Sequence, residues 1–187
     1  MEQRPQSWTY CVALLLFAVG IPVGTSLPDV DQRLPFLMHR SLLTHGLLLP
    51  VLLFVAIRKH PEHTARLFTM GFCLASAIHL CFDLFPRGWR GYALIWIPLH
   101  GRADATFSWL WIGAGCIVCL YLALVLVKYV FEIFLAAASL VATFAWNSSG
   151  EPRAGLSALA LTAAVAAVLL LPSRAGTVLR QAAFKKR

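Results

Sequence analysis

The sequence predicts an all-α, polytopic membrane protein, a transmembrane helix bundle of about six spans. The chain has 187 residues, of which 59% are hydrophobic and only 13% charged, and its mean hydropathy is +0.74. A soluble domain is normally about half apolar and about a quarter charged. The apolar residues also fall into runs close to the roughly 17–25 residues that a helix needs to cross the hydrocarbon. We therefore expect one integral membrane domain over residues 1–187, with the chemically interesting motifs in 25–104 and a basic cytoplasmic tail at 173–187.

Six apolar runs are the candidate spans. The first is interpreted as a span and not as a cleaved signal peptide, because more spans follow it and no small-residue cleavage site with a polar mature region lies behind it. Several runs are short, which a span accommodates by little tilt, by local thinning of the bilayer or by packing inside a bundle. The predicted spans are 8–24, 42–57, 67–83, 105–127, 130–147 and 155–171.

The boundary between the fourth and fifth spans has no glycine or proline to mark it. From Thr106 to Trp146 only Lys128 and Glu132 interrupt the apolar run, and a helix of about 40 residues is about twice as long as the bilayer core is thick. A tight reversal between these two charges is therefore expected. Because Lys128 and Glu132 are also four residues apart, they could pair on one continuous helix, which leaves five spans open as the alternative. Glu132 is expected to be a partner of Lys128.

The distribution of basic residues predicts the orientation. With six spans, ten of the 16 Lys and Arg residues lie on one side of the membrane and six on the other. The positive-inside rule then places both termini in the cytoplasm and the long segments 25–41 and 84–104 outside. Topology explains the formal net charge of +8, so we expect no nucleic-acid partner. The expected localisation is the cytoplasmic (inner) membrane, with the tail near anionic lipid head groups.

Ionisable residues of metal-binding types gather at the ends of the first three spans. Ionisable groups near the hydrocarbon are costly and are functional candidates by default. Spans one and three run in one direction and span two returns, so simple threading brings all of these residues to the outer face. They are Asp29 and Asp31 after span one, His39 and His45 around the start of span two, and His79 and Asp83 at the end of span three.

Mixed imidazole and carboxylate donors favour zinc, manganese or iron over calcium or magnesium. We expect the six residues above to bind one or two divalent ions, with zinc as the predicted metal. Asp31 or Asp83 would act as general base, and Arg40 would neutralise an anionic transition state. His100 and Asp104 repeat the His-x-x-x-Asp spacing on the same side and are second-tier ligand or substrate-binding candidates.

Each motif also has a purely structural interpretation. A single His-x-x-x-Asp on a helix is often a polar packing pair. Two aspartates flanking one residue are often a turn and a helix cap. A histidine at a span end often only meets the interface. The convergence of all these motifs on one face is what favours a functional site.

The order of the motifs resembles the LexA-regulated (YdjM-like) membrane-bound metal-dependent hydrolases. The resemblance covers residues 25–100 and rests on Pro28-Asp29-Val30-Asp31, His39-Arg40 with Thr44-His45, His79 to Asp83, and a glycine-containing loop leading to Trp96-Ile97-Pro98. It implies a small multi-span inner-membrane protein that is a metal-dependent hydrolase, with a remote likeness to zinc-dependent phospholipase C. The chain departs from the family pattern in having Gln32 after the second aspartate, one extra residue between His39 and His45, and no early histidine.

The sequence thus predicts a membrane-embedded metal-dependent hydrolase whose site opens at the outer face. Its substrate would be a lipid, a lipid-linked ester or another phosphoester, because the site lies at head-group depth. Two alternatives stay open. A metal or proton transporter would need polar residues through the membrane depth, and the last three spans hold almost none. A non-catalytic scaffold of the same fold is supported by Gln32 and the altered histidine spacing.

Overall fold

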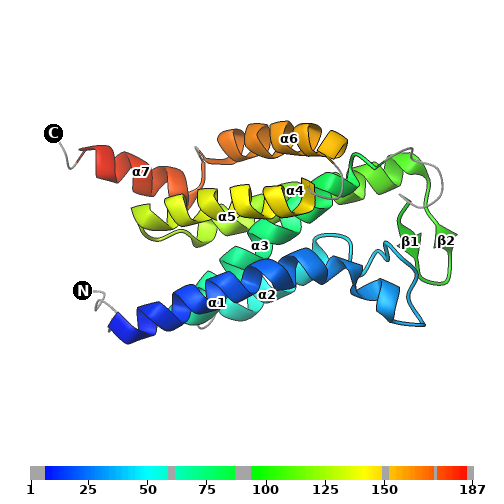
Figure 1. Ribbon diagram of the computed structural model, residues 1–187, viewed down its shortest axis with the longest axis horizontal. Coiled ribbons are helices and arrows are strands. Elements are labelled where there is room, and N and C mark those ends of the chain that lie inside the picture. The colour runs from blue at the N-terminus through cyan, green and yellow to red at the C-terminus, as the bar shows by residue number, and fades with distance from the viewer. Residues whose placement is uncertain (1–6, 59–61, 87–93, 149–151, 171, 185–187) are drawn as a thin grey trace.

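The computed structural model describes residues 7–58, 62–86, 94–148, 152–170 and 172–184. Within these ranges the chain is mainly helical (Figure 1). Its elements are α1 (Ser7–Ser26), the 3-10 helix η1 (Pro28–Arg33), α2 (Leu48–Arg58), α3 (His63–Asp83), β1 (Trp96–Ile97), β2 (Gly101–Arg102), α4 (Ala105–Leu126), α5 (Val130–Ser148), α6 (Pro152–Leu170) and α7 (Arg174–Phe184). The predicted all-α bundle is confirmed.

Four of the described helices, α1, α3, α4 and α5, are long and apolar enough to cross a membrane. α2 and the apolar part of α6 are shorter. The start of α1 and the end of α7 lie at one end of the bundle, and η1 and the β1–β2 hairpin lie at the other (Figure 1). The protein is therefore a membrane protein with η1 and a short hairpin at the end opposite its termini.

α3 is the central helix, buried along almost its whole length from Arg66 to Asp83. It packs against α1, α4, α5 and α6. Its contact with α1 is the most extensive in the molecule and depends on glycines. A Cβ atom at Gly20 or Gly24 would overlap the backbone of Phe68 or Phe72, and one at Gly71 would overlap that of Phe17. Small residues let helix backbones approach closely where lipid supplies no hydrophobic driving force.

The expected reversal between the fourth and fifth spans is present, since α4 ends at Leu126 and α5 begins at Val130. The stop is made by Glu132, whose Oε2 accepts hydrogen bonds from the backbone N–H groups of Lys128 (2.7 Å) and Tyr129 (3.2 Å). The side chain of Glu132 pairs with Arg66 of α3, whose guanidinium also donates to the carbonyl of Leu126. Glu132 was expected to be a partner of Lys128; it contacts the backbone N–H of Lys128, and it forms a buried ion pair with Arg66.

The second predicted span begins later than expected. The sequence predicts a helix over 42–57, but α2 starts only at Leu48, and residues 34–47 form turns and bends. The reason is that Ser41, Thr44 and His45 are held by contacts with Asp31 and cannot join a helix. Only 11 residues of this span are helical, so α2 is about 16 Å long, half the thickness of the hydrocarbon core.

Two further elements were not anticipated from the sequence. β1 and β2 form a short antiparallel hairpin with Trp96 opposite Arg102, and β1 also pairs with Ser41. The predicted tail at 173–187 contains α7, which packs against α4, α5 and α6 and buries Ala175. The hairpin matters for the site because it fixes the backbone next to Arg40.

Candidate metal centre

The site begins with η1, the 3-10 helix that follows α1. Pro28 stands in its first turn, where a missing N–H costs nothing. η1 buries Asp31 completely and leaves the side chain of Asp29 partly exposed. The two carboxylates therefore differ in role, one belonging to the interior and the other facing an open space.

Asp31 organises the loop that carries the histidines. Its Oδ2 accepts hydrogen bonds from the backbone N–H of Ser41 (2.8 Å) and the hydroxyl of Thr44 (2.7 Å) and lies 3.1 Å from Nδ1 of His45. Burial alone would raise the pKa of Asp31, but the nearby imidazoles of His39 and His45 and the hydrogen bonds from Thr44 and Ser41 outweigh it and hold that pKa well below its usual range.

His45 is fully buried, and each of its two ring nitrogens lies near a carboxylate. Because Nδ1 faces Asp31, Nε2 points toward Asp29 Oδ1 and Asp83 Oδ2, each 3.6 Å away. Burial disfavours a charged imidazole, yet Asp29 and Asp31, with the charge of Asp83, raise the pKa of His45 to about 9. A carboxylate behind one ring nitrogen is the usual device for aiming the other at a metal.

α3 supplies His79 and Asp83 from its last turn. The two are four residues apart and share one helix face, with His79 Nε2 only 3.4 Å from Asp83 Oδ2. His79 Nε2 also lies 3.9 Å from Asp29 Oδ2. The other oxygen of Asp83 accepts a hydrogen bond from Arg40 Nη2 at 2.8 Å, so Oδ2 remains directed at the two histidines.

Arg40 reaches Asp83 from an unusual backbone conformation. Its φ is 61°, in the left-handed region that few non-glycine residues adopt. The carbonyl of Arg40 accepts from the N–H of Trp96, and Leu42 N–H donates to the Trp96 carbonyl, so strand β1 holds the turn in place. Arg40 was expected to neutralise an anionic transition state. Its buried ion pair favours a different role, which is to orient Asp83.

The centre of the cluster contains polar atoms without partners. Within the described residues, His45 Nε2, His79 Nε2 and Asp83 Oδ2 are buried and have no hydrogen-bond partner. The same is true of Asp31 Oδ1. Such atoms are rare in native proteins and call for an explanation. Two ligand atoms on a tetrahedral zinc ion lie about 3.4 Å apart, given metal–ligand distances of about 2.1 Å. The observed separations of 3.4 and 3.6 Å fit that geometry.

The donors form two overlapping groups of three. His45, His79 and Asp83 make one, and Asp29, His39 and His45 make the other, with the ligand atoms of each group within 4.8 Å of one another. His39 and Asp29 have the most exposed side chains of the ligand candidates; His39 Nδ1 lies 3.8 Å from Asp29 Oδ1 and 3.7 Å from Asp31 Oδ1. The six predicted ligand residues are thus brought together at one end of the bundle, as the threading argument predicted.

The second-tier candidates are not part of either group. His100 is exposed in the β1–β2 hairpin, with Nδ1 3.4 Å from the Pro98 carbonyl. Asp104 is the N-cap of α4, where its carboxylate accepts from the N–H of Phe107 at 2.9 Å. Their His-x-x-x-Asp spacing therefore does not place both on one helix face, because the hairpin ends between them.

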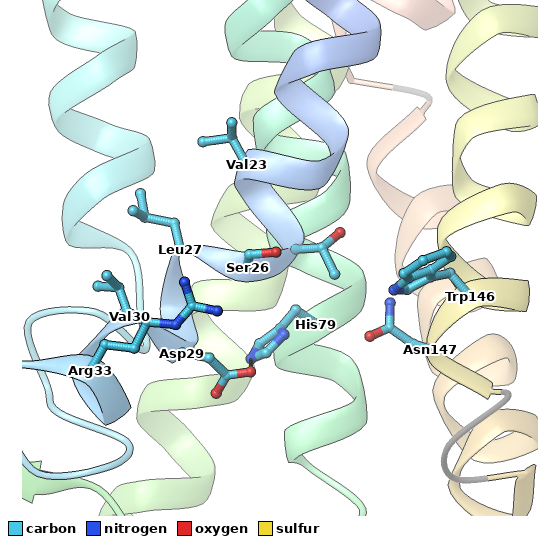
Figure 2. Close-up of a pocket in the computed structure, with 10 residues that line it drawn as sticks. Val23, Ser26, Leu27, Asp29, Val30, Arg33, His79, Trp146 and Asn147 are labelled. Atoms are coloured by element: carbon cyan, nitrogen blue, oxygen red, sulfur yellow. Dashed lines mark ion pairs between the residues drawn. The ribbon is translucent and has the colours of Figure 1, made fainter.

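Several residues of the site carried no signal recognised in the sequence. Arg33, Trp146 and Asn147 line a cavity of about 460 Å³ beside Asp29 and His79 (Figure 2). Trp111 donates its indole N–H to the carbonyl of His45 at 2.8 Å. Its ring occupies the space where a Cβ at position 46 would lie, which requires Gly46.

Asn147 lines two neighbouring cavities. A smaller cavity of about 170 Å³ is lined by Arg40, Phe82 and Asp83, and both His79 and Asn147 line the two cavities. The end of α5 therefore closes over the metal-ligand candidates of α3, a contact between segments more than 60 residues apart that no local pattern encodes.

No protein-family model, curated protein or solved structure matches the chain. The resemblance to the LexA-regulated hydrolases therefore stays a prediction that depends on the motifs alone. What the fold and the geometry define by themselves is a helical membrane protein with a cluster of histidine and aspartate side chains at one end.

Proposed function

We propose that this protein is a metal-dependent hydrolase whose site opens at the outer face of the cytoplasmic membrane. The observation that carries the proposal is a set of three buried atoms without hydrogen-bond partners, Nε2 of His45, Nε2 of His79 and Oδ2 of Asp83. The Asp83 oxygen lies 3.6 and 3.4 Å from the two nitrogens, and all three atoms lie within 4.8 Å of one another, which suits one cation. Uncompensated polar burial is costly, and a divalent ion would satisfy all three atoms at once. Zinc suits two imidazoles and a carboxylate best.

The residues divide the work between them. His45, His79 and Asp83 would hold the ion, with Asp29 and His39 as further ligands or as a second site. Asp31 and Arg40 would orient His45 and Asp83 from behind. The bound cation would supply Lewis acidity and activate a water molecule for attack on an ester.

Asp29 is the better placed general base of the carboxylates. The side chain of Asp29 is 41% exposed, whereas those of Asp31 and Asp83 are 0% and 12% exposed. Asp29 also lines the large cavity together with His79. A base must lie within reach of both the attacking water and the solvent that takes the proton away. Substrates would be lipids or other phosphoesters, because the cluster lies at the end of helices that span the bilayer.

Metal content of the purified protein tests this proposal. Detergent-solubilised wild-type protein is expected to retain stoichiometric zinc. His45→Ala and His79→Ala are expected to lose it, each because one of three ligands is removed. His100→Ala is the matched control, an exposed histidine at the same end of the molecule, and should retain zinc. Hydrolysis of a chromogenic phosphodiester should follow zinc content across the four proteins.

Three results would contradict the hydrolase. Negligible metal in all four proteins would favour the non-catalytic scaffold. Zinc bound as expected, with no turnover of phosphoesters or lipid esters, would leave a metal-binding protein without this activity. Ion flux in proteoliposomes that His79→Ala abolishes would favour a transporter.

A further inference from the structure

We infer that the 460 Å³ cavity beside the cluster is a substrate pocket, which receives the phosphate-bearing head group of a membrane lipid from between α1 and α5, with Arg33 as its phosphate anchor. The inference rests on the proposed function, because a substrate in this pocket would lie against the metal-ligand candidates Asp29 and His79. It adds the class of substrate, its route and the residues that recognise it.

The cavity is of the right size and in the right place. A volume of about 460 Å³ lies within the roughly 300–1,000 Å³ typical of small-molecule sites. Its inner wall includes Asp29 and His79, and Figure 2 shows these two side by side at the centre, with Arg33 to one side and Trp146 and Asn147 across from them. A bound molecule would therefore touch the ligand candidates directly.

The charges of the lining favour an anion held between two positive centres. Arg33 is the one Lys or Arg among the described residues that line the cavity, and an arginine fork matches phosphate oxygens well. Ser26 adds a hydroxyl donor from the end of α1. The carboxylate of Asp29 would repel a phosphate in the metal-free protein, so binding of the anion should require the cation.

Asn147 offers a complementary group for the rest of the head group. Its Nδ2 donates to the Thr143 carbonyl at 2.9 Å, so its Oδ1 is the atom that can accept from a ligand. A lipid head group that carries a hydroxyl beyond the phosphate, such as phosphoglycerol, presents a matching donor. The pocket would thus recognise phosphate at one side and a hydroxyl at the other.

The position of the cavity favours a lipid over a soluble phosphate ester. It lies between the last turns of α1 and α5, two long apolar helices that pack mainly on α3 and touch each other little. Trp146 is 76% exposed at its rim, as tryptophans of the membrane interface are. Val23, Leu27 and Val30 line the same space. A lipid can therefore enter sideways and keep its chains in the bilayer.

Retention of a defined lipid measured by native mass spectrometry tests the pocket without relying on turnover. Zinc-loaded wild-type protein is titrated with dioleoylphosphatidylglycerol in detergent. Arg33→Ala should bind this lipid at least about tenfold more weakly, since a hydrogen bond to a charged group is worth about that much. Arg33→Lys should recover part of the affinity. Arg102→Ala, an exposed arginine of the hairpin, is the matched control and should bind like wild type, and zinc content should be equal in all of them.

The outcomes separate the pocket from the proposed activity. Lipid retention that depends on Arg33 in a protein that hydrolyses nothing would support the pocket and overturn the hydrolase. Equal retention by the Arg33→Ala and Arg102→Ala proteins would overturn the pocket. So would equal retention of dioleoylglycerol, which has no phosphate. Binding of inorganic phosphate as tight as that of the lipid would overturn the assignment to a lipid.

Discussion

Asp31 is the residue that joins the two halves of the ligand set. It is buried in η1, accepts hydrogen bonds from Ser41 and Thr44, and contacts the ring of His45. These contacts hold the residues before α2 in a loop, although their apolar pattern would otherwise let them extend that helix. The role of Asp31 as an acceptor of three contacts leaves only Oδ1 available for anything else. This makes Asp31 a positioning residue and not a base.

Replacing Asp31 by Asn tests that role. The amide keeps the shape of the side chain but loses the negative charge that aims His45, so zinc affinity is expected to fall about 10–100-fold, the usual cost of losing such a partner behind a ligand. Competition with a zinc-binding dye measures this affinity. Asp104→Asn is the matched control, because asparagine caps a helix as well as aspartate does, and its affinity should not change. Equal affinities in the two variants would contradict the role given to Asp31.

The sequence was enough to predict which residues form the cluster and that they meet at one end of the bundle. It was not enough to predict which atoms of these residues face one another. Up-and-down threading is enough to bring Asp29, His45 and His79 to one end. Which oxygen of Asp83 faces a histidine depends on Arg40, and the conformation of Arg40 depends on a strand more than 50 residues later. The roles of Arg33 and Asn147 likewise arise only when α1 and α5 are packed on α3.

At the scale of single elements, the α1–α3 contact sets the distance between the two aspartates of η1 and the ligands of α3. η1 follows α1 directly, and Ser76 of α3 donates its hydroxyl to the Gly24 carbonyl at 3.1 Å. Any change that moves α1 outward therefore moves Asp29 away from His79.

Gly24→Ala is expected to do this. The new Cβ would overlap the backbone of Phe72, which cannot rotate away, so the helices must separate, and overpacking of this kind costs about 1–3 kcal/mol. Thermal unfolding in detergent and zinc content should both decrease. Gly113→Ala in α4 is the matched control, since nothing lies within 4 Å of its Cβ position, and its stability should be unchanged or higher. Unchanged zinc content in Gly24→Ala would contradict the coupling.

Element boundaries were predictable where an apolar run ends in polar residues, and failed where long-range contacts decide. The ends of α4 and α5 agree with the predicted spans because a charge marks each side of the reversal. The start of α2 disagrees by six residues, because Asp31 captures residues that have an apolar pattern. The β1–β2 hairpin had no strong local pattern of its own, whereas α7 has a clear amphipathic pattern that the prediction of a basic tail did not use.

At the scale of the whole molecule, the two ends of the bundle have different tasks. The end with the metal-ligand candidates contains unpartnered polar atoms. At the other end, Arg66 and Glu132 form a buried pair whose partners include the Leu126 carbonyl, two backbone N–H groups and the hydroxyl of Tyr10. This network pairs both terminal guanidinium nitrogens of Arg66 and both carboxylate oxygens of Glu132, leaves Arg66 Nε without a hydrogen-bond partner, and ties α1, α3, α4 and α5 together far from the site.

Removing one partner of this pair should destabilise the protein without affecting the site. Glu132→Ala leaves a buried guanidinium uncompensated and is expected to cost about 3–5 kcal/mol, seen as a lower unfolding temperature. The double variant Arg66→Met/Glu132→Leu should be much closer to wild type, because both charges are gone. Zinc bound per folded molecule should be the same in all three proteins. A loss of zinc from folded Glu132→Ala would contradict the separation of the two ends.

The orientation of the molecule is open to direct measurement. Leu99 is fully exposed at the hairpin, and Arg58 is exposed at the far end of α2. In a Cys11→Ser background, a membrane-impermeant maleimide applied to intact spheroplasts should label Leu99→Cys and not Arg58→Cys, with both labelled after lysis. The reverse pattern would place the cluster on the cytoplasmic side and contradict the positive-inside assignment.

The hydrogen bond from the Trp111 indole to the His45 carbonyl has a consequence for biogenesis. Together with the pairing of β1 beside Ser41, it means that the nascent chain cannot finish the imidazole and carboxylate cage until its fourth helix has begun to insert. If the proposed metal centre is correct, its ion would be bound only late in assembly. With the orientation proposed above, the metal would come from the pool outside the cytoplasm, and cytosolic zinc chaperones would have no access to it.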